Sequence, residues 1–220
     1  MRISIIIPAL NAALALPATL AAVMNADEIV VVDGGSDDDT AECARASGAL
    51  VITAPRGRGA QLSAGAAAAR HDWLLFLHAD TILAPGWRAV CERFAACTNG
   101  RAASFRFALD DGAWQARLLE RLVSWRSHLL GLPYGDQGLL IHRDALDRVG
   151  GYAPLPLMED VDLVGRLHPD GLTQLASHAV TSAARWRRDG WLRRSLRNLA
   201  CLGLFKLGVS PGRIAQIYGR

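Results

Sequence analysis

An aspartate that follows a buried apolar run is a candidate for metal and phosphate chemistry. Residues Trp73–Leu77 read as a buried strand, and the run ends in His78, Ala79 and Asp80. Strands that helices cover on both faces are continuous apolar runs, and open α/β sheets bind ligands just beyond the carboxyl ends of their strands. A carboxylate placed there can hold a divalent cation against a phosphate. The structural alternative is that Asp80 caps a following turn or helix, with Pro85 at its start.

Asp33 is a second carboxylate at the end of a predicted strand. The β-branched run that begins at Glu28 reaches it, and Gly34 and Gly35 follow. At such a strand end a carboxylate can accept hydrogen bonds from a base N–H or from ribose hydroxyls. The alternative is an ordinary turn aspartate, which the glycines after it also favour.

A basic loop, Arg56-Gly57-Arg58-Gly59, leads into a predicted helix over 60–70. Two guanidinium groups, a flexible backbone and the positive end of a helix dipole together suit an anion. The alternative is a solvent-exposed loop whose arginines only add solubility.

Two adjacent acids, Glu159 and Asp160, open a further predicted helix after Pro154-Leu155-Pro156. Acids in a first turn commonly stabilise the helix dipole, and by themselves these residues favour that structural role. The functional alternative is a general base whose pKa is raised by acidic neighbours or by partial burial.

The elements that must position these side chains alternate along the first hundred residues. Strands are predicted at 3–8, 28–33, 49–52 and 73–77, and helices at 17–24, 41–46 and 60–70. This order with short links predicts a parallel, doubly wound α/β sheet with right-handed crossovers. The first strand ends in Pro8-Ala9-Leu10-Asn11, without the GxGxxG turn of NAD-binding proteins or the glycine-lysine loop of P-loop enzymes.

The second half of the chain is less regular. Helices are predicted over 85–96 and 115–130, an antiparallel strand over 103–109, a further strand over 137–142 and an apolar helix over 196–209. That last helix is too short and too charged at its edges to span a bilayer. No repeat or long linker divides the sequence, so we expect one domain.

Composition and charge narrow the class of protein. Apolar residues make up 51% of the 220 residues, enough for a sizeable core. The four cysteines lack metal-ligand spacing and residues 1–10 lack a signal-peptide pattern, so we expect a cytoplasmic protein with reduced thiols.

The charge is distributed unevenly. From Ala179 onward, nine basic side chains face Asp189 alone, a net charge of +8, while residues 1–178 carry −5. A basic tail suggests an anionic surface or a phosphorylated ligand, or else an ordinary solvated helix face. Nucleic acid is not expected, because no stacking aromatics interleave the basic residues.

Four segments in register resemble the inverting family 2 glycosyltransferases of the GT-A type: Ser4–Asn11, Val31–Asp37, Phe76–Asp80 and Met158–Leu163. The resemblance spans most of the chain and implies a Rossmann-like α/β fold, with a mostly parallel central sheet flanked by helices and a helical C-terminal extension. Three more segments look like a compact branch associated with radical-SAM proteins and selenoproteins: Arg56–Ala69, His78–Thr81 and Tyr134–Gly138.

The resemblance implies a role for each matching residue. Asp33 matches the aspartate that contacts the nucleotide base, and Asp80 the last carboxylate of the DxD motif, which bridges Mg²⁺ or Mn²⁺ to the donor diphosphate. Asp160 matches the base that deprotonates the acceptor hydroxyl, with Glu159 beside it. Other positions of the donor site are Pro8, Asn11, Arg58 and His78. The donor implied is a nucleoside diphosphate sugar, by preference UDP-linked.

The same resemblance divides the single domain, 1–220, into three parts. Residues 1–100 would form the nucleotide-sugar-binding half, 101–178 the acceptor and catalytic half, and 179–220 the basic helical tail. The acceptor is expected to be a small molecule or lipid-linked. A homodimer and peripheral contact of residues 196–209 with an anionic membrane are both left open.

Two departures from the family pattern qualify the resemblance. His78 replaces the first aspartate of the DxD motif, so the metal would be held by Asp80, the diphosphate and water, with the imidazole as a further ligand or a hydrogen-bond partner of the ribose. Processive polysaccharide synthases carry Gln-x-x-Arg-Trp, whereas Arg185-Trp186 follows Ser182-Ala183-Ala184 here. A single, non-processive sugar transfer fits better than polymer synthesis.

Two other functions stay open from the sequence. A sugar-1-phosphate nucleotidyltransferase has a similar sheet, but its glycine-rich signature after the first strand is not supplied by Pro8-Ala9-Leu10-Asn11. A non-catalytic protein that binds sugar nucleotides would explain His78 as a sign of lost metal affinity.

Overall fold

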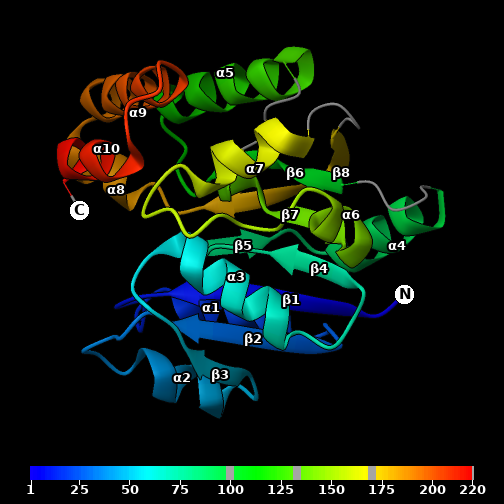
Figure 1. Cartoon of the computed structure of the whole chain (residues 1–220). Helices are drawn as coiled ribbons and strands as arrows, with labels where there is room; N and C mark the ends of the chain where they lie inside the picture. The colour runs from blue at the N-terminus through cyan, green and yellow to red at the C-terminus, as the bar shows by residue number, and fades with distance from the viewer. Residues whose placement is uncertain (98–101, 131–134, 168–171, 220) are drawn as a thin grey trace.

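The computed structural model describes residues 1–97, 102–130, 135–167 and 172–219. Within them an eight-stranded sheet has the order β3-β2-β1-β4-β7-β6-β8-β5. The first four of these strands are parallel: β1 (Ile3–Ala9), β2 (Glu28–Asp33), β3 (Leu50–Thr53) and β4 (Trp73–Phe76). These strands confirm the predicted doubly wound arrangement (Figure 1).

The other half of the sheet mixes directions. Strand β7 (Leu139–His142) runs antiparallel to both β4 and β6 (Ala102–Leu109). The predicted strand over 103–109 is therefore antiparallel to one neighbour, but it also pairs in parallel with β8 (Leu172–Thr181). Strand β8 was not predicted, because its alternating positions are filled by small and polar residues that give a weak apolar signal. The short strand β5 (Thr81–Leu83) pairs antiparallel with β8.

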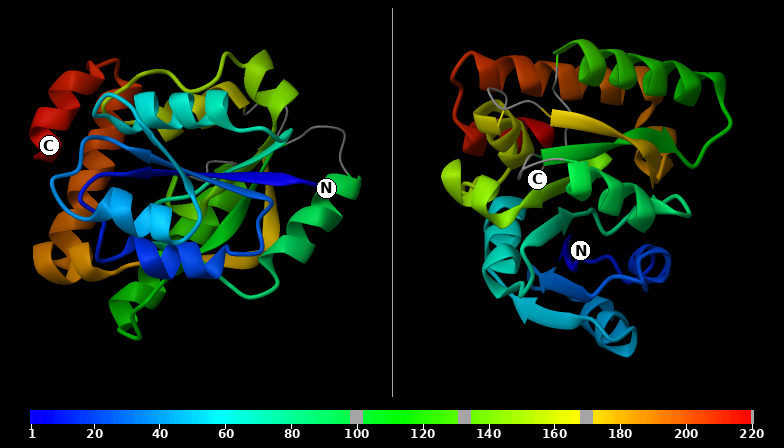
Figure 2. Two further views of the ribbon diagram at one scale, coloured as in Figure 1. Left: turned by 90° about the horizontal axis from the view of Figure 1, so that it is seen from below. Right: turned by 90° about the vertical axis from the view of Figure 1, so that its right-hand side faces the viewer.

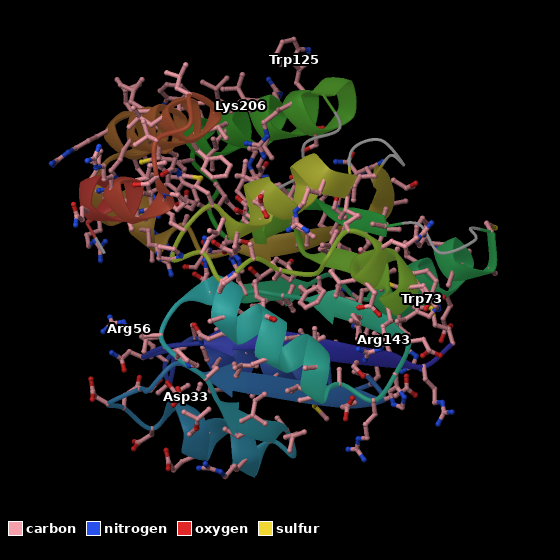
Figure 3. The ribbon with its side chains drawn as sticks, in the orientation of Figure 1. Asp33, Arg56, Trp73, Trp125, Arg143 and Lys206 are labelled. Atoms are coloured by element: carbon pink, nitrogen blue, oxygen red, sulfur yellow. The ribbon has the colours of Figure 1, made fainter. Side chains whose placement is uncertain are left out.

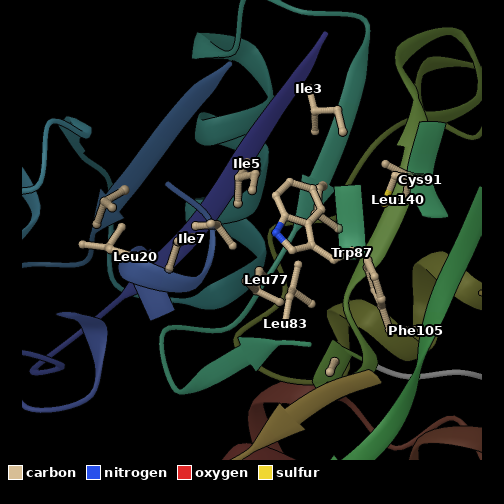
Figure 4. Packing of buried hydrophobic residues seen from close by; sticks show 14 of the residues in the cluster. Ile3, Ile5, Ile7, Leu20, Leu77, Leu83, Trp87, Cys91, Phe105 and Leu140 are labelled. Atoms are coloured by element: carbon tan, nitrogen blue, oxygen red, sulfur yellow. The ribbon is translucent and has the colours of Figure 1, made fainter. Parts of the chain in front are cut away.

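Helices cover both faces of the sheet because alternate side chains of β1 point to opposite sides. Ile3, Ile5 and Ile7 belong to a core with α1 (Leu16–Ala22), α2 (Thr40–Ala46) and α4 (Trp87–Cys97). Figure 4 shows the indole of Trp87 between side chains of β1 and those of Leu77 and Leu83.

On the other face, Ile6 packs in a second core with α3 (Arg58–Ala68), α6 (Arg143–Arg148) and α7 (Glu159–Leu167). Helix α3 approaches the strands closely at Gly65, where a Cβ atom would lie 2.3 Å from Cγ2 of Ile6. Glycine at this position therefore allows the helix to lie directly against β1.

The remaining helices gather over one end of the molecule (Figure 2). They are α5 (Trp114–Leu130), α8 (Ala184–Asp189), α9 (Trp191–Lys206) and α10 (Pro211–Tyr218). The 3-10 turn η1 (Gly135–Gln137) lies against β6 and β8. The predicted helix over 196–209 begins earlier, at Trp191, and ends at Lys206. Among the described residues, no helix is both long and apolar enough to cross a bilayer.

Candidate functional site

Two cavities lie at the edge of the sheet where the parallel strands end. Strand register places Ala9 of β1 level with Asp33 of β2, and β4 ends beside them just before His78. In Figure 3, Asp33 and Arg56 mark this edge, while Trp73 and Arg143 mark the opposite edge. The cavities thus lie at the carboxyl ends of the strands, where open α/β sheets bind their ligands.

The first cavity has a volume of about 650 Å³, within the range of small-molecule sites. Its wall comes from the ends of β1 and β4, from the start of α3 and from α8. It includes five of the residues that the sequence assigned to donor binding, namely Pro8, Asn11, Arg58, His78 and Asp80, together with Arg56 and Arg185.

Asp33 lies next to this cavity and organises the loop beside it. Its carboxylate accepts hydrogen bonds from the Gly35 amide at 3.2 Å and from the amide and hydroxyl of Ser36. Ser36 Oγ in turn accepts a hydrogen bond from the backbone N–H of Asn11 at 2.9 Å. The side-chain Oδ1 of Asn11 accepts one from the backbone N–H of Asp37, also at 2.9 Å. Asp33 is buried and is not among the residues that line the cavity.

Gln61 of α3 holds the ends of β1 and β2 together. Its Nε2 donates to the carbonyl oxygens of Ala9 and Val32, both at 2.8 Å, and its side chain is buried. A buried amide with two good acceptors ties α3 to β1 and β2 at the level of the cavity. The sequence assigned no role to Gln61, because its acceptors are backbone carbonyls distant in sequence.

Arg58 connects the basic loop to the acidic helix start. Its Nε lies 2.7 Å from Oε1 of Glu159, whose side chain is only 1% exposed, and its NH1 lies 3.3 Å from Nε2 of His78. Burial disfavours the charge of Arg58, but the carboxylates of Glu159 and Asp160 outweigh it and raise its pKa. Glu159 therefore serves as the buried counterion of Arg58, and it is not among the residues that line either cavity.

Asp160 faces the second cavity, which has a volume of about 190 Å³. The chain enters α7 through Met158, whose φ of +67 is unusual for a residue with a side chain. One carboxylate oxygen, Oδ1, accepts a hydrogen bond from the Val161 amide at 2.8 Å. The two adjacent acids thus point to different surroundings, one into the protein and one into a cavity.

Four residues line both cavities and form the wall that they share: Arg58, His78, Asp80 and Arg185. Arg185 NH2 lies 3.4 Å from Oδ2 of Asp80, and the Asp80 carbonyl accepts a hydrogen bond from the Ser182 amide at 3.2 Å. In the sequence, the Arg185-Trp186 pair argued only against processive synthesis. Its position at the shared wall is a finding of the structure.

Asp136 is a further acid of the second cavity that the sequence did not single out. Desolvation raises its pKa to about 6, helped by the negative charge of Asp160 and opposed by Arg126. It belongs to the predicted motif over 134–138, of which Tyr134 lies outside the described residues. Burial thus raises the pKa of an acid that lines the same cavity as the predicted base.

The far side of the second cavity is built by the C-terminal helices. Arg194, almost fully buried, donates to Asp189 Oδ2 at 2.9 Å and to the Tyr218 hydroxyl at 3.0 Å, and its guanidinium lies 4.9 Å from the centre of the Trp186 ring. Arg197 donates to the same Asp189 oxygen at 2.8 Å. One aspartate therefore fixes two arginines of α9.

The residues of the shared wall are compatible with a divalent cation. Within 1–97, 102–130, 135–167 and 172–219 no group of three or more His, Cys, Asp or Glu could hold one. Mg²⁺, however, is commonly bound by one or two carboxylates together with substrate phosphates and water, not by a complete protein cage. Asp80 and His78 offer one carboxylate and one imidazole for such a site.

Comparison with known proteins identifies relatives of this chain. The model of the family described as Glycosyl transferase family 2 matches residues 4–146. Two proteins named as uncharacterized glycosyltransferases, from Mycobacterium tuberculosis and Mycobacterium bovis, are each 32% identical over 170 residues, which cover 71% of this chain and 77% of theirs.

Solved structures share the fold at lower identity. Glucosyl-3-phosphoglycerate synthase from M. tuberculosis, in complex with Mn²⁺, UDP and glucosyl-3-phosphoglycerate, is 22% identical with a TM-score of 0.57, over 82% of this chain and 70% of that chain. The same enzyme with Mg²⁺ and UDP gives a TM-score of 0.58 at 22% identity, over 82% and 69%. The likeness confirms the predicted GT-A-type α/β fold with its curled, mostly parallel sheet.

Proposed function

We propose that this chain, which belongs to glycosyltransferase family 2, moves one sugar from a nucleoside diphosphate sugar to an acceptor hydroxyl with inversion at the anomeric carbon. The observation that carries the proposal is the shared wall between the two cavities. A donor in the larger cavity and an acceptor in the smaller one would meet at Arg58, His78, Asp80 and Arg185. Asp160, the proposed base, stands on the acceptor side of that wall.

The larger cavity suits the donor. Arg56 and Arg58 sit at the start of α3, where guanidinium groups and backbone amides favour a diphosphate. The loop held by Asp33 would support the base and ribose. The donor is proposed to be UDP-linked, because glucosyl-3-phosphoglycerate synthase, which shares the fold, was solved with UDP and with UDP-glucose. Asp80 and His78 would hold Mg²⁺ or Mn²⁺, which when bound neutralises charge on the leaving diphosphate.

Asp160 is proposed to act as the general base. Its carboxylate would accept the proton of the acceptor hydroxyl, whose oxygen then forms a bond to the anomeric carbon. The bond from that carbon to the diphosphate oxygen breaks, and its electron pair leaves with the nucleoside diphosphate. Arg58 and Arg185 at the wall would stabilise the negative charge that develops. Glu159 acts through Arg58, as a positioning residue.

Four narrower assignments remain proposals. The membership of a compact branch associated with radical-SAM proteins and selenoproteins rests on the motifs alone. The division at residues 100 and 178 and a cytoplasmic location rest on the sequence. The acceptor is proposed to be a small molecule or a lipid-linked hydroxyl compound, and the family match favours transfer over the nucleotidyltransferase and non-catalytic alternatives.

Donor turnover in the presence of Mn²⁺ tests the proposal. Asp160→Asn and Asp80→Ala should each lower turnover of the preferred UDP-sugar by about 100-fold or more, because one loses the base and the other the carboxylate at the shared wall. Asp144→Asn, a change at an exposed carboxylate of α6, is the matched control and should keep wild-type turnover. Wild-type turnover by both site variants would overturn the mechanism, and a retained anomeric configuration in the product would overturn inversion.

A further inference from the structure

Helix α5 has a second apolar face that points away from the protein. Its inner side packs into a core through Ala116 and Val123. Its outer side exposes four large apolar residues at spacings of four, four and three, which places them on one stripe: Trp114, Leu118, Leu122 and Trp125. Trp125 is 64% exposed, and Figure 3 shows it projecting outward from the helix.

Helix α9 repeats this arrangement. Leu192, Leu196 and Leu199 are exposed at spacings of four and three, so they too share one side of the helix. Leu192 is 72% exposed. Exposed apolar residues that occur singly are common on proteins, but two helical stripes are not.

The two helices belong to the same part of the surface. Leu119 of α5 and Trp191 of α9 pack against one buried cluster around Phe107 and Trp186. Both helices lie along the same outer edge of the molecule in Figure 1 and in the right-hand view of Figure 2. We call the exposed stripes on α5 and α9, taken together, the outer apolar face.

Positive charge surrounds this face. Residues 190–220 contain no Asp or Glu, and they include six arginines and lysines. Arg121, Arg193 and Lys206 are exposed on α5 and α9, and none of them forms a salt bridge with the residues that the structure describes. Tryptophan and leucine flanked by uncompensated basic residues are typical of helices that lie in the interface of an anionic membrane.

The outer apolar face meets the mouth of the second cavity. Leu199 is 62% exposed on α9 and is also part of the lining of the cavity that Asp160 faces. Leu202, on the same helix, lines that cavity as well. An apolar surface that continues into the acceptor cavity would let an acceptor enter from the surface on which the protein lies.

From these observations we infer that the outer apolar face of α5 and α9 docks on a bilayer containing anionic lipid, with the acceptor cavity opening at the bilayer surface. The inference rests on the proposed function only in treating the second cavity as the acceptor site. It specifies the partner as a lipid surface, in preference to a second copy of the chain, because a copy would bring the same uncompensated positive charge to the same face.

Cosedimentation with vesicles tests this inference. The full chain should bind vesicles of phosphatidylcholine and phosphatidylglycerol about tenfold or more tightly than vesicles of phosphatidylcholine alone. Leu122→Glu/Leu192→Glu should lose about tenfold or more in affinity, because each helix then presents a charge to the lipid. Arg193→Gln/Lys206→Gln should bind both kinds of vesicle almost equally. Met24→Glu changes an exposed apolar residue in the turn after α1 and should bind as the wild type does.

The outcomes separate the inference from the proposed function. Asp160→Asn should bind vesicles normally while it fails in transfer, and circular dichroism should show that every variant is folded. Equal binding by the wild type and Leu122→Glu/Leu192→Glu, or no binding by the wild type, would overturn the inference. So would a stable dimer in light scattering that Leu122→Glu/Leu192→Glu converts to monomer without any effect on vesicle binding.

Discussion

The two cavities are built by different kinds of interaction. The walls of the first are fixed mainly at backbone groups: strand ends in register, two strand carbonyls that accept hydrogen bonds from the buried Gln61 side chain, and a helix start that touches a loop at Gly59. The far wall of the second is fixed by side chains, through the ion pairs of Asp189 with Arg194 and Arg197 and the ring of Trp186. Under the proposed function, the side chains that build the second cavity could vary with the acceptor while the strands and helix start at the first cavity stay the same.

The largest effect that would sharpen this contrast concerns Asp136. Its raised pKa of about 6 means that the folded protein keeps a proton that the unfolded chain releases near pH 4. The free energy of unfolding should therefore fall by a total of about 3 kcal/mol as pH rises from about 4 to about 6, and stay low at higher pH. Asp136→Asn should remove this slope and be more stable than the wild type above pH 6.

Urea denaturation at several pH values measures the effect of Asp136. The exposed carboxylate of Asp144 provides the control, since Asp144→Asn should leave the slope in place. A free energy of unfolding that changes with pH in the same way in the wild type, in Asp136→Asn and in Asp144→Asn would contradict the assignment. Transfer should also lose any pH dependence near 6 in Asp136→Asn if this acid acts in the acceptor cavity.

A smaller effect is expected on the donor side at Gly59. An added Cβ would lie 2.2 Å from the Ala153 carbonyl oxygen and 2.7 Å from the Leu155 amide nitrogen. Gly59→Ala must push α3 away from the loop before α7, at a cost of about 2 kcal/mol, and should weaken donor binding because Arg58 moves with it. Calorimetric donor binding and urea denaturation measure both.

The control for Gly59 is another helical glycine with free space around it. A Cβ at Gly165 of α7 would meet nothing within 4 Å, so Gly165→Ala should gain up to about 1 kcal/mol. If Gly59→Ala were equally stable and bound donor normally, the donor site would be more adaptable than the contrast drawn above allows.

The smallest effect is expected on the acceptor side at Asp189. Its ion pairs with Arg188, Arg197 and Arg194 lower the pKa of this carboxyl. The pairs are therefore present above its ordinary pKa of about 4 and lost only as pH falls through the lowered value. Asp189→Asn should raise the acceptor KM about threefold while donor binding stays unchanged, and added salt should reduce the difference between the two proteins. A change confined to donor binding would reverse the contrast.

Part of this site was predictable from local sequence. The strands that end near Pro8, Asp33 and His78 follow from apolar runs closed by turn residues, and the helix start at Glu159 follows from its acids and the prolines before it. The sequence also predicted the acidic body with its basic tail. These features depend on neighbours in the chain, which periodicity and helix-capping rules describe well.

The pairings across the site were not predictable in this way. Arg58 and Glu159 stand about a hundred residues apart, as do Asp80 and Arg185, and nothing local marks them as partners. The same holds for β8, which inserts between β5 and β6 with little apolar signal.

The sequence by itself therefore determined the order of the elements over residues 1–77, the family and the chemical types of the candidate residues, because each depends on short stretches of chain. The tertiary structure alone decided that Glu159 is a buried counterion while Asp160 faces a cavity, although the two are adjacent. It also decided which apolar stripes of α5 and α9 remain exposed to solvent. Burial and charge pairing are set by elements that meet in space, and the sequence pattern of a single helix does not show which of its faces will be covered.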